Sequence, residues 1–426
     1  MTETDLPATP EAPKRFNPFT ALGPGLVTGA ADDDPSGIAT YSQAGAQFGF
    51  QMLWTVVLTY PFMAVFQLTC AEIARVSGRG LARNMTQSFP RPLVLGIVAL
   101  LLFANTLNIA ADLAAMGEVS ALVIGTKSHL YTISFALLSL LLQVFVPYHR
   151  YVSLLKWLTL VLFAYVGVVL IVDVPWGEAL KAIVWPQLHF TSAAATMVVA
   201  VFGTTISPYL FFWQAAQEVE EMGREHKHAL KHDHAAAAAE MRRMRFDTWG
   251  GMGFSNLVSF SIILATAATL HASGKTINSA ADAAMALRPI AGDFAFGLFA
   301  VGIIGTGMLA VPVLAGSAAY ALSEVMGWRA GLELAPRRAG HFYGVITLAI
   351  LAAVMLDFSN VNPVTALFWS AVVNGVVAVP VMVVIMVLAN RKSVMGSFTL
   401  GRWQGRFGWA ATGLMAAASA TMLVLL

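Results

Sequence analysis

Three consecutive aspartates, Asp32, Asp33 and Asp34, stand in the segment GAADDDPSGIAT (residues 29–40), which is apolar on both sides. Grouped carboxylates bind hard cations through oxygen, or take up and release protons. Pro35 follows directly, so Asp34 can act as the N-cap of a helix whose first residue is the proline. Which chemistry applies depends on whether the segment lies in water or inside a membrane.

The composition places the chain in a membrane. Of its 426 residues, 58% are hydrophobic and 11% are charged, whereas about a quarter of the residues in ordinary soluble domains are charged. Apolar runs near the roughly 20 residues that span a bilayer recur to the end of the chain. We therefore predict an all-α polytopic membrane protein embedded in a lipid bilayer. Its single cysteine, Cys70, excludes an internal disulfide and a thiolate metal cluster.

The apolar runs divide the chain into eleven predicted crossings. They are residues 20–48, 52–74, 92–118, 129–147, 152–172, 192–222, 247–271, 293–326, 341–356, 361–389 and 407–426. With a cytoplasmic amino terminus, 21 of the 25 Lys and Arg residues fall in inside regions, as the positive-inside rule requires. We expect a multi-pass protein of the cytoplasmic membrane, with the amino terminus inside and the carboxyl terminus outside.

The crossings also set the expected organisation. We expect a disordered cytoplasmic tail (1–19), a first five-helix repeat (20–172), a second five-helix repeat (192–389) with a cytoplasmic loop (223–246), and an additional helix (407–426). The loop contains HKHALKHDH, residues 226–234. Histidines this dense are typical either of a solvated loop, the favoured interpretation, or of a weak metal site or sensor.

The first crossing is predicted to be a broken helix. The stretches before and after the aspartates, residues 20–31 and 37–48, each have twelve residues, which is too short to span alone. The aspartates would then lie near mid-membrane, with Asp34, Pro35, Ser36 and Gly37 as an unwound hinge. Carboxylates and open backbone at that depth indicate a functional cavity, and a cation is the expected partner. The alternative is an ordinary loop before a capped helix.

A second break is predicted in the sixth crossing, in the segment VFGTTISPYLFFWQ. Pro208 and the small polar run from Gly203 to Ser207 stand in mid-segment, five crossings after the first break. Matching interruptions in two halves are typical of transporters built from inverted repeats. A simple proline kink is the alternative.

The two breaks resemble those of a known family. GPGLVTGAADDDPSGIATYSQAGAQFGFQMLW resembles the first helix of the Nramp divalent metal transporters, with its Asp-Pro-Gly-Asn hinge, and GTTISPYLFF resembles their sixth helix. SGRGL after the second crossing and AADLAAMGE in the third are similar to the family as well. The resemblance implies a LeuT-type inverted repeat (5+5) with an eleventh helix.

The resemblance also implies metal ligands. Asp34 matches the hinge aspartate that binds metal in the family, and Thr204 matches a residue that offers its backbone carbonyl. Gly37 stands where a ligand asparagine is expected, and Ser207 replaces a methionine thioether. With Asp33 as a further candidate, the implied ligands are all oxygen, which favours hard ions such as Mg²⁺ or Mn²⁺. In this respect the chain resembles the Nramp-related magnesium transporters.

Proton handling is implied to differ from the family pattern. Asp112 matches an aspartate of the family's proton pathway, but Ala115 stands at the neighbouring glutamate and Tyr209 replaces a histidine. We therefore expect proton coupling to be weak or absent. Asn374 falls roughly where the family places a glutamine near the ion, so it is expected to line the path.

Other polar residues have structural interpretations. Glu72 and Arg75, three residues apart, are predicted to form an ion pair at the inner end of a helix. The acidic run from Glu218 to Glu221 would form an exit vestibule or be solvated. Asn105, Asn108 and Asn256 would line the path or, preferably, bond between helices.

The predicted function is transport of a divalent metal ion, Mg²⁺ or Mn²⁺, by alternating access. The metal would be the substrate, and neither a cofactor nor a nucleic-acid partner is expected; the sequence does not indicate the oligomeric state. The alternatives are a transporter of an organic solute on the same fold, a Mg²⁺-dependent intramembrane enzyme, and a channel. The adjacent aspartates disfavour binding of an anionic solute, and no second acidic motif with basic groups appears, as an enzyme acting on pyrophosphate would need.

Overall fold

The computed structural model describes residues 24–125, 127–147, 150, 159–187, 191–234, 237–359 and 361–426. Within these ranges the regular structure is helical. The predicted tail (1–19) and the first residues of the predicted fifth crossing lie outside the described residues.

Helices overlap every predicted crossing. The long elements are α1 (Pro24–Asp32), α2 (Pro35–Phe48), α3 (Leu53–Ser77), α5 (Arg91–Ile124), α6 (Ser128–Phe145), α8 (Phe163–Ile171), α10 (Ser192–Thr205), α11 (Pro208–Arg224), α12 (Ala237–Thr269), α15 (Ala295–Met326), α16 (Gly340–Asp357), α17 (Pro363–Asn390) and α19 (Arg402–Leu425). Short elements join them: η1 (Gly49–Met52), α4 (Leu81–Ser88), η2 (Thr159–Leu162), α9 (Trp176–Val184), η3 (His271–Ser273), α13 (Ala280–Ala284), η4 (Met285–Leu287), α14 (Arg288–Ala291), η5 (Gly292–Phe294) and α18 (Lys392–Met395).

In the described part of the chain, nine helical runs are long and apolar enough to cross a membrane, or ten if a bent pair is one span. The bent pair joins Leu160–Ile171 to Trp176–Val184 at an angle of 115°. One of the nine runs, Pro35–Ser77, has 43 residues, about twice what one crossing requires. It contains η1, which begins at Gly49 with a φ of 58°, and it therefore covers parts of two predicted crossings.

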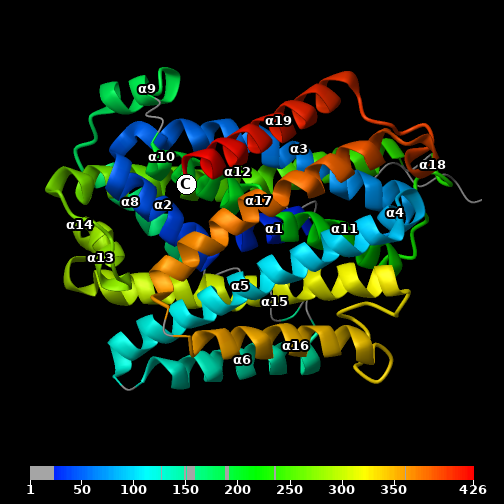
Figure 1. The fold of residues 1–426 in the computed structure, drawn as a ribbon, viewed down its shortest axis with the longest axis horizontal. Coiled ribbons are helices and arrows are strands. Elements are labelled where there is room, and N and C mark those ends of the chain that lie inside the picture. The colour runs from blue at the N-terminus through cyan, green and yellow to red at the C-terminus, as the bar shows by residue number, and fades with distance from the viewer. Residues whose placement is uncertain are drawn as a thin grey trace, which may run out of the picture.

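The helices form two packed groups with α17 between them (Figure 1). In one group α12 packs against α1, α2 and α3, and α3 packs against α11. In the other group α5, α6, α15 and α16 pack against one another, and α6 and α16 lie side by side at the lower edge of Figure 1. Because α17 contacts α2, α5 and α10, the two broken helices lie where the groups meet.

The two ends of the molecule differ in charge. One end, here called the basic end, carries α4 and α18 at the right of Figure 1, with Arg79, Arg83 and Arg391. The opposite end carries α9, α13 and α14 at the left. The helices run between these ends, so one half of each broken helix lies toward the basic end and the other half toward the opposite end.

Glycines allow the first half of each broken helix to approach its neighbour closely. A Cβ atom on Gly29 of α1 would lie 2.2 Å from the backbone oxygen of Gly251 in α12. A Cβ atom on Gly203 of α10 would lie 2.1 Å from the backbone oxygen of Ala371 in α17. Both distances are far below van der Waals contact, so a larger residue at either position would push the helices apart.

Candidate metal site at the paired helix breaks

Both predicted helix breaks are present. Only Asp33 and Asp34 separate α1 from α2, and only Ile206 and Ser207 separate α10 from α11. Asp34 caps α2 as predicted, because its Oδ1 accepts a hydrogen bond from the backbone N–H of Gly37 at 2.7 Å.

The predicted hinge residues are placed differently from expectation. Pro35, Ser36 and Gly37 form the first turn of α2 rather than an unwound segment, because a proline fits the first helical position and the Asp34 cap holds the turn. Pro208 likewise begins α11. The open backbone is therefore shorter than predicted and lies one residue earlier at the first break.

Asp34 belongs to a polar cluster with α5 and α17. The Asn108 side-chain amide donates to Asp34 Oδ2 at 2.9 Å and to Asp112 Oδ2 at 3.1 Å. Its own Oδ1 accepts from Asn374 Nδ2 at 3.1 Å. All four side chains are buried, so Asn108 joins the carboxylate at the break to α5 of the facing group and to α17.

Two oxygens of this cluster are open to a ligand. Asp112 Oδ1 and Asn374 Oδ1 are buried and have no hydrogen-bond partner in the protein. Buried acceptors are nearly always paired with protein, water or an ion. Together with Asp34 they supply carboxylate and amide oxygens, which are the ligands that hard divalent cations prefer.

Asp32 and Asp33 have their partners on α12 instead. Ser255 Oγ donates to Asp32 Oδ2 at 2.8 Å and to Asp33 Oδ1 at 3.1 Å, and Ser259 Oγ lies 3.4 Å from Asp33 Oδ1. Asp32 Oδ1 and Asp33 Oδ2 are buried without a protein partner. The three aspartates therefore divide into a pair bonded to α12 and a single residue bonded to α5. Asp33 as a metal ligand stays a prediction.

Thr204 lies beside Asp34 through the space at Gly37. A Cβ atom on Gly37 would lie 3.0 Å from Thr204 Oγ1 and 3.4 Å from Asp34 Oδ1, so the missing side chain leaves both oxygens facing one small space. Ser207 Oγ donates to the Thr204 carbonyl at 2.8 Å and to the Gly203 carbonyl at 2.9 Å. The carbonyl expected as a ligand thus already accepts one hydrogen bond, and its second lone pair is the one left for a cation.

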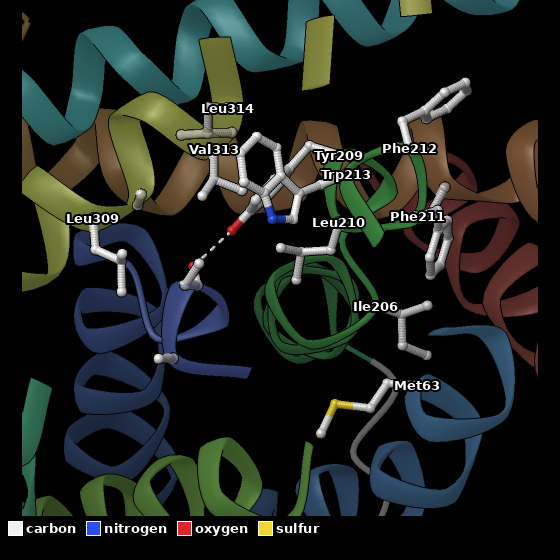
Figure 2. Close-up of a cluster of buried hydrophobic side chains, with 14 of the residues drawn as sticks. Met63, Ile206, Tyr209, Leu210, Phe211, Phe212, Trp213, Leu309, Val313 and Leu314 are labelled. Carbon is white, nitrogen blue, oxygen red and sulfur yellow. Dashed lines mark hydrogen bonds between the residues drawn. The ribbon is translucent and has the colours of Figure 1, made fainter. Parts of the chain in front are cut away.

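Tyr209 ties the two breaks together. Its hydroxyl donates to the Ala31 carbonyl in the last turn of α1 at 3.1 Å, the dashed line in Figure 2. Figure 2 also shows Tyr209 and Trp213 of α11 beside Val313 and Leu314 of α15. The hydroxyl therefore satisfies a carbonyl that the helix end leaves open, a structural role at a position where the family resemblance implied proton handling.

Further hydrogen bonds hold the half-helices in register. Thr28 Oγ1 donates to Gln214 Oε1 at 2.6 Å between α1 and α11, and the hydroxyls of Tyr41 and Thr205 are 3.1 Å apart between α2 and α10. Each half of the first broken helix is therefore bonded to a half of the second.

The predicted ion pair between Glu72 and Arg75 is wrong. Arg75 is buried and binds Glu240 of α12 at 2.6 Å, while Glu72 accepts from Gln404 at 3.0 Å. Spacing along one helix could not reveal the partner, because Glu240 is brought to Arg75 by the packing of α12 on α3.

The acidic end of α11 is neither a vestibule nor simply solvated. Glu218 is buried and binds Arg243 at 2.8 Å, and Glu221 binds the same guanidinium at 3.0 Å. Lys227 of the following loop binds Glu240 at 2.5 Å. Partial burial opposes the charge of Lys227, but Glu225 and Glu240 raise the pKa of its ammonium overall. These ion pairs connect α3, α11 and α12 at the basic end.

The histidine-rich loop docks on the same end. The backbone N–H groups of Leu230 and Lys231 donate to the carbonyls of Arg75 and Val76 at 3.0 and 3.3 Å. Among the described residues, no three His, Cys, Asp or Glu side chains are grouped so that they could hold a metal ion. The loop is therefore attached to the bundle through its backbone, and its solvation stays a prediction.

Comparison with known proteins identifies the family. The sequence model described as Nramp, natural resistance-associated macrophage protein-like, matches residues 25–425. The chain belongs to the Nramp family. The resemblance found in the two breaks is thereby confirmed over nearly the whole chain.

Relatives of known name are similar along their length. The divalent metal cation transporter MntH of Burkholderia ambifaria is 26% identical over 387 residues, which are 89% of this chain and 82% of the relative. MntH of Deinococcus radiodurans is 26% identical over 422 residues, with 94% and 88% covered. Both carry the names of metal cation transporters rather than enzymes.

Solved structures confirm the fold. A manganese transporter of Eremococcus coleocola, in complex with an aromatic bis-isothiourea substituted compound, aligns with a TM-score of 0.73 at 17% identity, covering 98% of this chain and 88% of that one. The nucleobase-cation-symport-1 family transporter Mhp1 aligns with a TM-score of 0.53 at 14% identity, covering 95% and 92%. The all-α polytopic membrane fold of LeuT type that the sequence predicted is therefore confirmed.

Proposed function

We propose that this chain moves a divalent metal cation across the cytoplasmic membrane by alternating access. The observation that carries the proposal is the hydrogen-bonded cluster of Asp34, Asn108, Asp112 and Asn374. It joins Asp34, at a helix break, to Asp112 of α5 through the Asn108 amide, where the two packed groups of helices meet. A cation bound there would contact both groups, so its binding and release can follow their relative movement.

The oxygen chemistry of the site supports Mg²⁺ or Mn²⁺ as the substrate. Asp34 and Asp112 supply carboxylates, Asn374 an amide oxygen, Thr204 a carbonyl and an adjacent hydroxyl, and Ser207 a hydroxyl. No sulfur ligand belongs to this set, and oxygen-only sites suit hard cations better than soft ones. The structural neighbour from Eremococcus coleocola is likewise a manganese transporter by name.

We further propose that proton coupling is weak or absent. The Tyr209 hydroxyl donates to a backbone carbonyl. Ala115, three residues after Asp112 on α5, has no side chain that can carry a proton. The membrane potential can drive uptake alone, since about 2.3 kcal/mol per charge per 100 mV gives about 4.6 kcal/mol for a divalent cation.

The proposed orientation places the basic end in the cytoplasm, following the bias of Lys and Arg. The amino terminus is then inside and the carboxyl terminus outside. The repeats are proposed as residues 20–172 and 192–389, with the loop 223–246 inside and 407–426 as the additional helix. The matching breaks of α1–α2 and α10–α11, each with its proline at the first position of the second half, support this division.

The organic-solute alternative has weaker support at this site. A solute carboxylate held by the half-helix amino termini would meet the carboxylates of Asp34 and Asp112, and like charges in a buried site repel strongly. The cluster instead presents acceptors with open oxygens, which complement a cation.

Uptake into proteoliposomes tests the proposal. We expect Mg²⁺ or Mn²⁺ to enter, Cd²⁺ to compete poorly, and Asp34→Ala to abolish uptake. Asp293→Ala, which removes a fully exposed carboxylate near the opposite end, is the matched control and should transport normally. Rates at equal and unequal pH test the coupling, and strong acceleration by an inward proton gradient would contradict its absence. Normal uptake by Asp34→Ala, or no divalent uptake by the wild type, would contradict the function.

A further inference from the structure

A small cavity lies between the candidate metal site and the opposite end of the molecule. It is lined by Ala39 of α2, Ala115 and Val119 of α5, Leu367 of α17 and, as its charged residue among the described ones, Glu118 of α5. It leaves about 20 Å³ for the centre of a water-sized sphere, which is room for about one water molecule.

The cavity is aligned with the metal site. Residues seven apart on a helix share a face and lie about 10 Å apart along the axis. Ala115 is seven residues from Asn108, Val119 is seven from Asp112, and Leu367 is seven from Asn374. The helix faces that line the cavity thus continue, two turns further in, into the polar cluster.

A wider polar hollow adjoins the cavity toward the opposite end. Its lining includes the side chains of Gln43, Asn278, Asn362 and Thr365, and it shares Ile277 and Val364 with the cavity. From the opposite end inward, the polar hollow is followed by the small cavity, here called the neck, whose lining is mostly apolar. The buried polar cluster comes next. A cation crossing the neck loses water contacts, which is costly unless a carboxylate replaces them.

Glu118 is placed to do this. The side chain is half-buried, and its Oε2 is buried without a hydrogen-bond partner. This oxygen is therefore open to a ligand. We propose that Glu118 forms an outer binding site for a divalent cation, which it holds before the ion reaches Asp34. This inference rests on the proposed function and orientation.

The test separates this role from a purely structural one. Glu118→Gln keeps the size of the side chain but removes the charge, and Glu118→Asp keeps the charge. In proteoliposomes we expect Glu118→Gln to raise the KM for Mn²⁺ about three- to tenfold, more at low ionic strength, with the maximal rate nearly unchanged. Glu118→Asp should have a KM close to that of the wild type. Glu178→Gln removes an exposed charge from α9 at the same end and should leave KM unchanged.

An unchanged KM in Glu118→Gln, with wild-type uptake intact, would overturn the inference but leave the proposed function standing, whereas no wild-type uptake would remove both. A second variant tests the same site if Glu118→Gln folds poorly. Glu118→Cys, in a Cys70→Ala background, should react with a charged thiol reagent from the opposite end, and Mn²⁺ should slow the reaction. Labelling only from the basic end, or labelling that Mn²⁺ leaves unchanged, would contradict the outer site.

Discussion

Replacing Asn108 by alanine should weaken metal binding, and it should lower the free energy of unfolding no more than the loss of another buried asparagine does. The Asn108 amide donates to Asp34 at 2.9 Å and to Asp112 at 3.1 Å, so it fixes the direction of both carboxylates. Loss of a group that orients a metal ligand typically costs 10- to 100-fold in affinity. For Asn108→Ala we therefore expect the Kd for Mn²⁺ to rise about 10- to 100-fold, which is about 1.4 to 2.7 kcal/mol.

The chain offers a matched control on the same helix. Asn105 is equally buried and donates two hydrogen bonds, to the Leu314 carbonyl and to Ser317 Oγ, each at 2.8 Å. Asn105→Ala should therefore lower the free energy of unfolding by an amount similar to Asn108→Ala, about 1 to 3 kcal/mol, but leave the Kd unchanged. Calorimetric titration of Mn²⁺ into the purified protein, with thermal unfolding in detergent, measures both quantities. Equal metal affinity in the two variants would refute the assigned role of Asn108.

Three further substitutions test the packing and the bonds around the site. Tyr209→Phe removes the bond to the Ala31 carbonyl and should lower the free energy of unfolding by about 1 kcal/mol; a large change in the pH dependence of uptake would indicate the proton role instead. Gly203→Ala should be destabilising by about 1 to 3 kcal/mol or more, because its Cβ would meet the Ala371 backbone at 2.1 Å. Gly96→Ala, with open space around it, is its control and should be neutral or slightly stabilising in thermal unfolding. Arg75→Ala should lower the free energy of unfolding by about 1 to 3 kcal/mol, because it removes a buried charged hydrogen bond to Glu240, which keeps Lys227 and Arg243 as partners. Glu72→Gln should have a smaller effect, and a larger effect of Glu72→Gln would contradict this assignment of partners.

The helix breaks could be predicted because their causes are local. A proline after a capping residue, with twelve apolar residues on either side, is visible in the sequence alone. The number of unwound residues at the first break is harder to predict from the sequence. It depends on the Asp34 side chain bonding to Gly37, which draws Pro35, Ser36 and Gly37 into α2 instead of leaving them open.

The division of the three aspartates could be predicted only in part. Neighbouring residues near a helix end point in different directions, so the sequence predicts that at most one other aspartate joins Asp34. The partners depend on which helices pack around the break. Ser255 and Ser259 are one turn apart on α12, a spacing too common to be informative before the packing of α12 on α1 is known.

The partner of Asn108 could not be predicted from the sequence either. The place of Asn108 among several asparagines in apolar crossings predicts a bond between helices, and Asn108 makes one with Asn374. Its contact with Asp34 joins residues 74 apart in the sequence. Such a contact follows from the meeting of the two groups of helices, and no pattern within either segment indicates it.

The most direct test of the central claim compares Mn²⁺ binding to the wild type, Asp34→Asn and Asp33→Asn by calorimetric titration. The two variants remove one charge each from adjacent buried residues. Because Asp34 bonds to α5 and Asp33 bonds to α12, we predict that Asp34→Asn abolishes measurable binding while Asp33→Asn weakens it only a few-fold. Wild-type affinity in Asp34→Asn would contradict a metal site at the first helix break.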